Sequence, residues 1–374
     1  MEATIEIRHR ELGLVYQTEN ASCAAFPQSL LSNPNLYFLK GGTTLGISDI
    51  SFGVDIGPFF RVKRSFSSAA KVAAEIEKLG FDSVWIPDHE VDPLAMLSFI
   101  AAKTSSLKLG TCVLIPDHRN PVLLARQIST LDSLSHGRVI LGLGAGEGRE
   151  MFGTPIDRPV ARLLETIKIL KELWKCTKVA YHGDFWEIRD YSLKLKPIQK
   201  PHPPIWIGAS GPQMLKITAE HGNGCFGPPL TPKHYEEWLR RLRNVTEKVG
   251  RNPEEIMPAH LPFTSISKDH ETAVKWLERH VKWFLVWASQ PLGLLPQELG
   301  YKGKWEKEEN VPREAVERCF IVGTPEECTN KIKEFVYSGV RYFVLAVHAP
   351  DEKNYFQSLK FYADQVLPHF KEMT

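Results

Sequence analysis

Short apolar segments alternate with amphipathic segments along most of the chain, and this alternation constrains the fold more than any other feature. The apolar runs are typical of buried parallel strands, and each amphipathic segment has the spacing of a helix. Eight such units predict a (β/α)₈ TIM barrel with insertions, and a doubly wound parallel sheet is the second interpretation. The predicted strands are 51–56, 83–87, 107–116, 138–144, 204–209, 224–227, 256–267 and 342–347.

Helix signals separate these strands. Thr324 followed by Glu327 has the spacing of a capping box, and Pro121 stands at a predicted helix start. Residues 178–195 alternate as in a β-hairpin, and 291–312 form an excursion rich in Gly, Pro and Lys. The predicted helices are 65–79, 93–103, 121–135, 159–174, 211–221, 232–249, 269–288, 324–338 and a last one that ends near Phe370.

The first 48 residues are polar and irregular, so we expect an N-terminal extension (1–48) before one barrel domain (49–374). The net charge of +2 does not favour nucleic acid or a membrane as partner, and no apolar run approaches the ~18 residues of a membrane span. The six cysteines include no C-x-x-C pair. We therefore expect a cytoplasmic protein with free thiols that acts on a small molecule.

A glycine-rich stretch follows the fourth predicted strand. Gly142, Gly144, Gly146 and Gly148 alternate with other residues, and Glu147 stands among them. The stretch lacks the G-x-G-x-x-G spacing of dinucleotide-binding folds. It predicts either a close approach of backbone to a ligand, with a carboxylate at the barrel mouth, or only a tight turn.

Polar residues at the ends of barrel strands are the candidates for an active site. The turn 207–212 opens a helix, so it is either a phosphate-binding turn or a plain loop. His and Asp neighbours suit a metal, but no H-x-H or H-E-x-x-H accompanies them. The strand-end residues are Asp55, Asp88, His89, Cys112, Asp117, His118, Glu147, Ser210 and His348.

Five segments in matching order resemble the luciferase-like flavin and deazaflavin oxidoreductases: 80–89, 108–127, 137–147, 204–212 and 221–227. The chain is most similar to the branch that uses coenzyme F-420, an 8-hydroxy-5-deazaflavin with an anionic tail. This branch includes a methylenetetrahydromethanopterin reductase, a secondary-alcohol dehydrogenase and a glucose-6-phosphate dehydrogenase. FMN is the alternative cofactor, although FMN-dependent oxygenases more often carry a tryptophan near Glu147.

The resemblance implies a homodimer and two catalytic residues, His89 and Glu147. It implies a non-prolyl cis peptide between Cys112 and Val113, supporting one face of the deazaflavin, and a phosphate held by the turn before the helix at 211–221. The residues that it assigns to the coenzyme are Asp88, Cys112, Val113, Ala145, Gly146, Ala209, Ser210 and Gly211. It implies no metal ligand.

Two departures from the family pattern bear on the substrate. The dehydrogenases carry a tryptophan shortly after the histidine, whereas Glu90 to Pro93 follow His89 here. They also carry a glutamate after the first strand, where 59–63 contains none. The short loop after His89 is more like that of the methylenetetrahydromethanopterin reductase, which often has aspartate at the position of Glu147.

The expected activity is reversible hydride transfer between the deazaflavin and a small organic substrate, with His89 and Glu147 as acid and base. The substrate expected from the resemblance is a methylenetetrahydromethanopterin-type C1 carrier, or else an alcohol or a sugar phosphate. Three rivals remain: an FMN-dependent monooxygenase, a metal-dependent hydrolase using Asp88, His89 and His118, and a protein that only binds the coenzyme.

Overall fold

The computed structural model describes residues 50–63, 66–146, 157–228, 231–289 and 305–371, together with four short strands nearer the N-terminus. Strand β1 (Ile5–Arg8) pairs antiparallel with β2 (Val15–Thr18), and β3 (Leu36–Phe38) pairs antiparallel with β4 (Thr44–Gly46). By its contacts the chain divides into two compact units, Met1–Asp49 with Phe370–Thr374, and Ile50–His369. The second unit contains the barrel.

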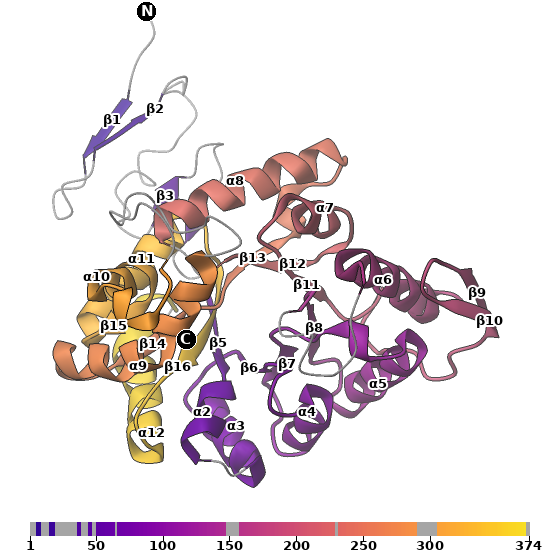
Figure 1. The fold of residues 1–374 in the computed structure, drawn as a ribbon, viewed down its shortest axis with the longest axis horizontal. Helices are drawn as coiled ribbons and strands as arrows, with labels where there is room; N and C mark the ends of the chain where they lie inside the picture. Colours follow the sequence, from indigo (N-terminus) through magenta and orange to yellow (C-terminus); the bar gives the residue numbers. More distant parts are fainter. Residues whose placement is uncertain are drawn as a thin grey trace, which may run out of the picture. The chain divides into compact units, whose positions relative to one another are not determined.

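Eight parallel strands form a closed barrel, which confirms the predicted TIM-barrel fold (Figure 1). The last strand pairs with the first, with Phe343 opposite Phe52, and so closes the ring. Each strand coincides with a predicted apolar run, because both faces of a parallel barrel strand are buried. The strands are β5 (Ser51–Asp55), β6 (Ser83–Ile86), β7 (Lys108–Thr111), β8 (Val139–Leu143), β11 (Ile205–Gly208), β12 (Gly224–Phe226), β13 (Met257–His260) and β16 (Tyr342–Val347).

Helices lie outside the strands, and six of the eight named below begin with proline. Proline suits this position because its missing N–H has no intrahelical partner there. The predicted capping box at Thr324 and Glu327 is confirmed. The helices are α3 (Ala69–Lys78), α4 (Pro93–Ala101), α5 (Pro121–Leu134), α6 (Pro159–Lys175), α7 (Pro212–His221), α8 (Pro232–Lys248), α11 (Pro325–Tyr337) and α12 (Glu352–Phe361).

Several elements differ from the sequence prediction. The strand predicted at 256–267 is divided into β13 and β14 (Phe263–Ile266), because Pro262 lies between them and has no N–H for the ladder. Strand β14 pairs with β15 (Ile321–Gly323), which the sequence did not predict. The strand predicted at 107–116 ends at Thr111. Two short helices, α2 (Gly57–Lys63) and α10 (Arg313–Cys319), were also missed.

The predicted hairpin consists of β9 (Val179–His182) and β10 (Glu187–Tyr191). The helix predicted at 269–288 is α9 (His270–Ser289), whose buried side chains pack with those of α10 and β15 in a second core. The predicted excursion at 291–312 falls largely outside the described residues. Shorter helical turns are η3 (Phe66–Ser68), η4 (Pro116–His118), η6 (Pro253–Glu255), η8 (Glu308–Asn310), η9 (Tyr362–Val366) and η10 (Leu367–His369).

Two indoles fill the barrel axis. The ring centroids of Trp85 and Trp206 lie 5.1 Å apart, and both rings contact Phe226. Glycines on neighbouring strands make room for them: a Cβ on Gly110 would lie 2.0 Å from Cε3 of Trp85, and one on Gly224 would lie 2.6 Å from Trp206. The interior of the barrel is therefore a packed core. A ligand-binding site must then lie at the carboxyl ends of the strands.

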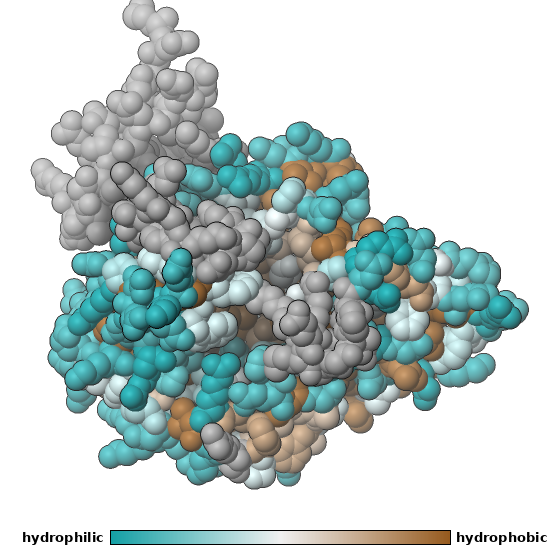
Figure 2. Space-filling view, viewed as in Figure 1, coloured by the Kyte–Doolittle hydropathy of each residue, from teal (hydrophilic) through white to brown (hydrophobic). Residues whose placement is uncertain are grey.

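Polar residues predominate on the face of the molecule drawn in Figure 2, and apolar residues form separate patches on it. No helix in the described part of the chain is long and apolar enough to cross a membrane. The more exposed large apolar side chains include Phe66, Phe99, Leu123, Leu134, Leu195, Ile198 and Trp283.

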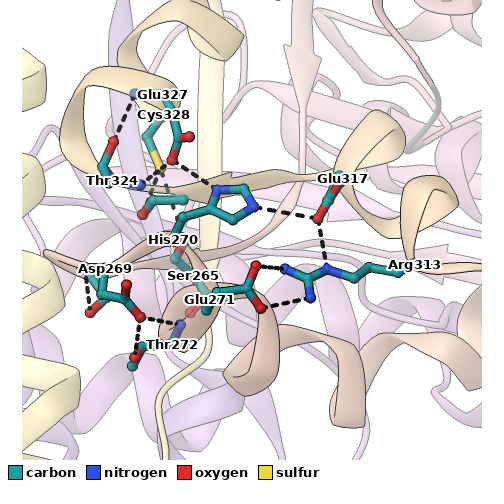
Figure 3. Close-up of polar contacts among 12 residues, drawn as sticks. Ser265, Asp269, His270, Glu271, Thr272, Arg313, Glu317, Thr324, Glu327 and Cys328 are labelled. Atoms are coloured by element: carbon teal, nitrogen blue, oxygen red, sulfur yellow. Dashed lines mark hydrogen bonds and ion pairs between the residues drawn. The ribbon is translucent and has the colours of Figure 1, made fainter.

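Charged side chains join the start of α9 to α10 and α11 (Figure 3). His270 Nδ1 lies 3.0 Å from the Glu327 carboxylate, and its Nε2 lies 3.4 Å from that of Glu317. Arg313 donates two hydrogen bonds to Glu271, at 2.8 and 2.7 Å. The hydrogen bond to Glu327 is the largest of the effects that raise the pKa of His270.

This contact should make stability depend on pH. Because the pKa of His270 is raised on folding, its stabilising effect is complete below its unfolded pKa of about 6.5 and is lost as pH rises through the folded value. We expect His270→Gln to lower the free energy of unfolding by about 1 kcal/mol or less at pH 5.5 and by almost nothing at pH 9, since the pair is partly exposed. Urea denaturation at both pH values measures this, and a Glu327→Gln background should remove most of the difference. A loss independent of pH would contradict the assignment.

Candidate active site

A buried carboxyl group stands at the end of the first barrel strand. Asp55 is the last residue of β5, is 6% exposed, and accepts a hydrogen bond from the Gly57 N–H at 2.8 Å. Burial raises its pKa to about 7, although the Gly57 N–H and the Arg61 charge oppose the rise. A carboxyl group with this pKa can give or take a proton near neutral pH. The sequence indicated Asp55 as a strand-end residue, with no role assigned to it.

Asp88 follows β6, and its carboxylate is held from two directions. Arg119 donates to it through both terminal nitrogens, at 2.6 and 3.0 Å, and the Ile115 N–H donates at 3.0 Å. Arg119 also reaches Asp92, which caps helix α4 by accepting from Ala95 N–H. The pair joins the loops that follow β6 and β7. Arg119 was not predicted from the sequence, although its position directly after Asp117 and His118 offered a signal.

His89 comes next in the loop between Asp88 and the cap of α4, and its side chain is exposed. Asp117 lies in η4 and is half-buried, whereas the side chain of His118 is outside the described residues. Within the part of the chain that the structure describes, no three His, Cys, Asp or Glu side chains gather closely enough to hold a metal ion.

The peptide bond between Cys112 and Val113 is cis, which confirms the geometry that the family resemblance implied. Both residues are half-buried and pack on the axial cluster that contains Trp85. Burial, and then the negative charge of Asp55, raise the pKa of the Cys112 thiol well above its usual value. A thiol in this environment stays protonated, so Cys112 is no nucleophile near pH 7.

Glycines surround Val113. A Cβ on Gly144 would lie 2.5 Å from Val113 Cγ2, and one on Gly208 would lie 3.4 Å from its Cγ1. Gly146 has a φ of +76°, a backbone conformation that favours glycine. Ala145 and Gly146 are half-buried at the end of the described stretch, and Glu147 lies outside the described residues.

The predicted anion-binding turn lies at the start of α7. Gly211 is the N-cap residue, with φ −92° and ψ 167°, and Pro212 begins the helix. Ala209 is buried, with its N–H bonded to Phe226 O and its carbonyl accepting from the Trp238 indole N–H. A Cβ built on Gly211 would meet nothing within 4 Å. The space beside Gly211 is therefore open, at a helix start of the kind that can bind an anion.

The last strand contributes His348 directly after β16, buried at 4% exposure. Its ring stacks on that of His280 from helix α9, with centroids 5.2 Å apart. His348 was predicted as a strand-end residue. His280 and Arg61 were not predicted, because their positions on helices gave no sign that they approach the barrel mouth.

Comparison with known proteins identifies the family. Residues 50–342 match the family model described as luciferase-like monooxygenase, so the chain belongs to this family, and the resemblance drawn from the sequence is confirmed. Among curated proteins, a 5,10-methylenetetrahydromethanopterin reductase from Archaeoglobus fulgidus is 30% identical, with 79% of this chain and 93% of the relative covered.

Further relatives agree with this assignment. An F-420-dependent glucose-6-phosphate dehydrogenase from Amycolatopsis mediterranei is 27% identical, over 80% of this chain and 93% of the relative. A coenzyme F-420-dependent tetrahydromethanopterin reductase from Methanopyrus kandleri is similar in structure, with a TM-score of 0.75, 25% identity, and coverage of 86% of this chain and 99% of that one. An F-420-dependent secondary alcohol dehydrogenase matches with a TM-score of 0.73; at 22% identity it shows the fold alone.

Proposed function

We propose that this protein is a coenzyme F-420-dependent oxidoreductase that transfers hydride reversibly between the deazaflavin and a small organic substrate. The relatives named above, a methanopterin reductase and a glucose-6-phosphate dehydrogenase, support this class. The structural observation that carries the proposal is the packing of Val113 against the glycine-lined ends of β8 and β11, next to the buried Asp55 carboxyl group at the end of β5.

The residues present fit such a coenzyme. Gly144 and Gly208 leave room for the Val113 side chain, and Gly146 leaves room for Ile115, so Val113 packs among the strand ends where a flat ring system would rest on it. We assign the ring's support to Val113, with Ala145 and Gly146, and the anionic tail to Ala209, Ser210 and Gly211. When bound, the deazaflavin supplies the carbon that accepts or donates hydride.

Proton handling falls to the chain's own acids and bases. Asp55 is one candidate, since burial raises its pKa to about 7, and His89 and Glu147 remain the candidates from the family resemblance. We propose that Asp88 acts on its neighbour: held by Arg119, it fixes the loop that presents His89. The packed axial core below the mouth excludes water from one side of the site.

A methylenetetrahydromethanopterin-type C1 carrier is the first substrate to test. The short loop after His89 and the relative from Archaeoglobus fulgidus favour it over an alcohol or a sugar phosphate. The single barrel domain at 49–374 and the homodimer remain predictions from the sequence.

A charge placed at the start of α7 should weaken coenzyme binding without harming the fold. Gly211→Asp puts a carboxylate into open space at an N-cap, a position where Asp stabilises helices. Two like charges in contact in water repel each other by about 1 kcal/mol, so we expect the carboxylate to raise the dissociation constant of the coenzyme, with its anionic tail, about fivefold or more. Gly211→Asn is the matched control, since it caps equally well and carries no charge; equal affinities of the two variants would refute the tail assignment.

Equilibrium titration of the purified protein with oxidised F-420 and with FMN tests the proposal as a whole. Binding of F-420 at micromolar or lower concentration, without binding of FMN, supports the proposal. Reduction of a methylene-pterin by reduced F-420 then tests the proposed substrate. Binding of FMN alone, with oxygen consumption, would instead favour a monooxygenase. Tight F-420 binding without turnover on pterins, alcohols or sugar phosphates would indicate a binding protein.

A further inference from the structure

The alternation of side chains along β16 places His348 at the barrel mouth. Tyr342 and Val344 belong to the axial cluster around Trp85, whereas the Phe343 ring stacks on that of Phe52 on the outer face of the barrel. Because side chains alternate with period two, Ala346 and His348 face the axis as well. The His348 N–H donates to Thr264 O at 2.7 Å, so the strand pairing continues to this residue.

His348 therefore lies one layer nearer the mouth than Asp55. Strand β5 pairs Asp55 with Ala346, and the next axis-facing residue of β16 is His348. Gly53 also faces the axis, since a Cβ there would meet Trp85. Asp55 lies two residues further along the same strand, so it faces the axis too. The two polar groups thus belong to neighbouring strands and successive layers of the same wall.

Helix α9 covers this histidine. The rings of His280 and His348 are stacked, with 27° between their planes, and the ring of Phe263 meets His348 edge-on at 5.6 Å. Within the described residues, Nε2 of His348 is buried and has no hydrogen-bond partner. A buried imidazole nitrogen without a partner is costly unless a ligand supplies one.

Burial, helped by the surrounding charges, keeps both rings neutral. Burial, His280 and Arg61 lower the pKa of His348 to about 3, and burial, Arg279 and Arg61 lower that of His280. Arg61 itself faces Glu90, at 3.6 Å. A neutral imidazole offers one donor and one acceptor, which matches a carbonyl or hydroxyl oxygen; a carboxylate or phosphate would favour a protonated ring.

We propose that His348 and His280 form a hydrogen-bonding subsite for an uncharged carbonyl or hydroxyl oxygen of the substrate, beside Asp55. The assignment to the substrate rests on the proposed oxidoreductase function. His348 contacts the oxygen directly, and His280 positions the His348 ring by stacking on it.

NMR of protein with isotope-labelled histidine tests this subsite without any turnover. Acetone and 2-propanol serve as uncharged probes, and acetate and inorganic phosphate serve as anionic ones. We expect the ring signals of His348 and His280 to shift with the first pair only. His260 is the internal control, because it is equally buried but packs outside the barrel against Phe335 and Tyr235.

Variants separate binding from folding. His348→Phe keeps a ring without donors and should raise the apparent dissociation constant for acetone at least fivefold, whereas His348→Gln keeps an N–H donor and should restore part of the affinity. If either variant fails to fold, the wild-type titration still decides. Larger shifts with phosphate or acetate, or no shift of His348 with any probe, would overturn the subsite.

The two proposals can fail independently. The probe titration is run with and without saturating F-420, and coenzyme binding is measured on the same sample. If the protein does not bind F-420 but acetone still shifts the histidine signals, the proposed function is refuted and an oxygen-binding subsite remains. F-420 binding without the acetone shifts would refute the subsite alone.

Discussion

Asp55→Asn should lower turnover by about 100- to 10,000-fold, the usual contribution of a positioned general acid or base. The substitution preserves the size of the side chain and the oxygen that accepts from Gly57 N–H, so the loop after β5 keeps its geometry. What it removes is a buried group with a pKa of about 7. Steady-state kinetics with F-420 and a reducible substrate, together with coenzyme affinity by titration, measure the effect, and affinity should change little.

The pH profile distinguishes a proton donor from a residue that only shapes the pocket. If Asp55 protonates the substrate during reduction, kcat/KM should fall as pH rises above about 7, and this limb should disappear in Asp55→Asn. Asp351→Asn is the matched control, since Asp351 caps α12 and asparagine caps equally well. Wild-type turnover and an unchanged profile in Asp55→Asn would assign proton transfer to His89 or Glu147 instead.

The same substitution should stabilise the protein at high pH. A carboxyl group whose pKa is raised on folding binds its proton more tightly in the folded state, so stability falls as pH rises from about 4 to about 7. Asparagine removes this penalty; one pKa unit corresponds to about 1.4 kcal/mol, so a gain of a few kcal/mol at pH 8 is the upper bound. A variant that is more stable and less active is the pattern expected when function requires an unfavourable buried group.

The barrel could be predicted from sequence because burial on both faces leaves a continuous apolar run at every strand. The capping box at Thr324 was equally local, since both of its partners lie within one turn. The division of the seventh predicted strand at Pro262 was missed. Proline is a signal for such a break, but apolar residues continue on both sides of it. Local signals therefore predict elements well, and their ends less well.

The site was predicted only in part, because its chemistry depends on contacts across the fold. Asp55 could be placed at a strand end, but its burial depends on how the mouth is closed. The partner of Asp88 is Arg119, 31 residues further along, and nothing in the intervening sequence pairs them. His280 lies in the helix predicted at 269–288, and that prediction gave no sign that its ring stacks on His348, directly after the last barrel strand.

Of the substitutions considered, Trp85→Ala should lower the free energy of unfolding the most. Trp85 is fully buried, contacts Trp206, Phe226 and Tyr342, and donates to Ser83 Oγ at 2.6 Å. Large aromatic-to-alanine changes in cores cost about 3–5 kcal/mol, and the upper end is expected because the glycines facing the indole bring no atoms to refill the cavity.

Urea denaturation of Trp85→Ala measures this loss, with Trp283→Ala as the matched control. Trp283 is 43% exposed on α9, so its truncation should cost well under about 1 kcal/mol. Added indole should partly restore the stability of Trp85→Ala, since apolar cavities of this kind bind apolar ligands. A loss below about 1 kcal/mol, or one equal to that of Trp283→Ala, would mean that the axial core collapses to fill the space and does not depend on the indole for its packing.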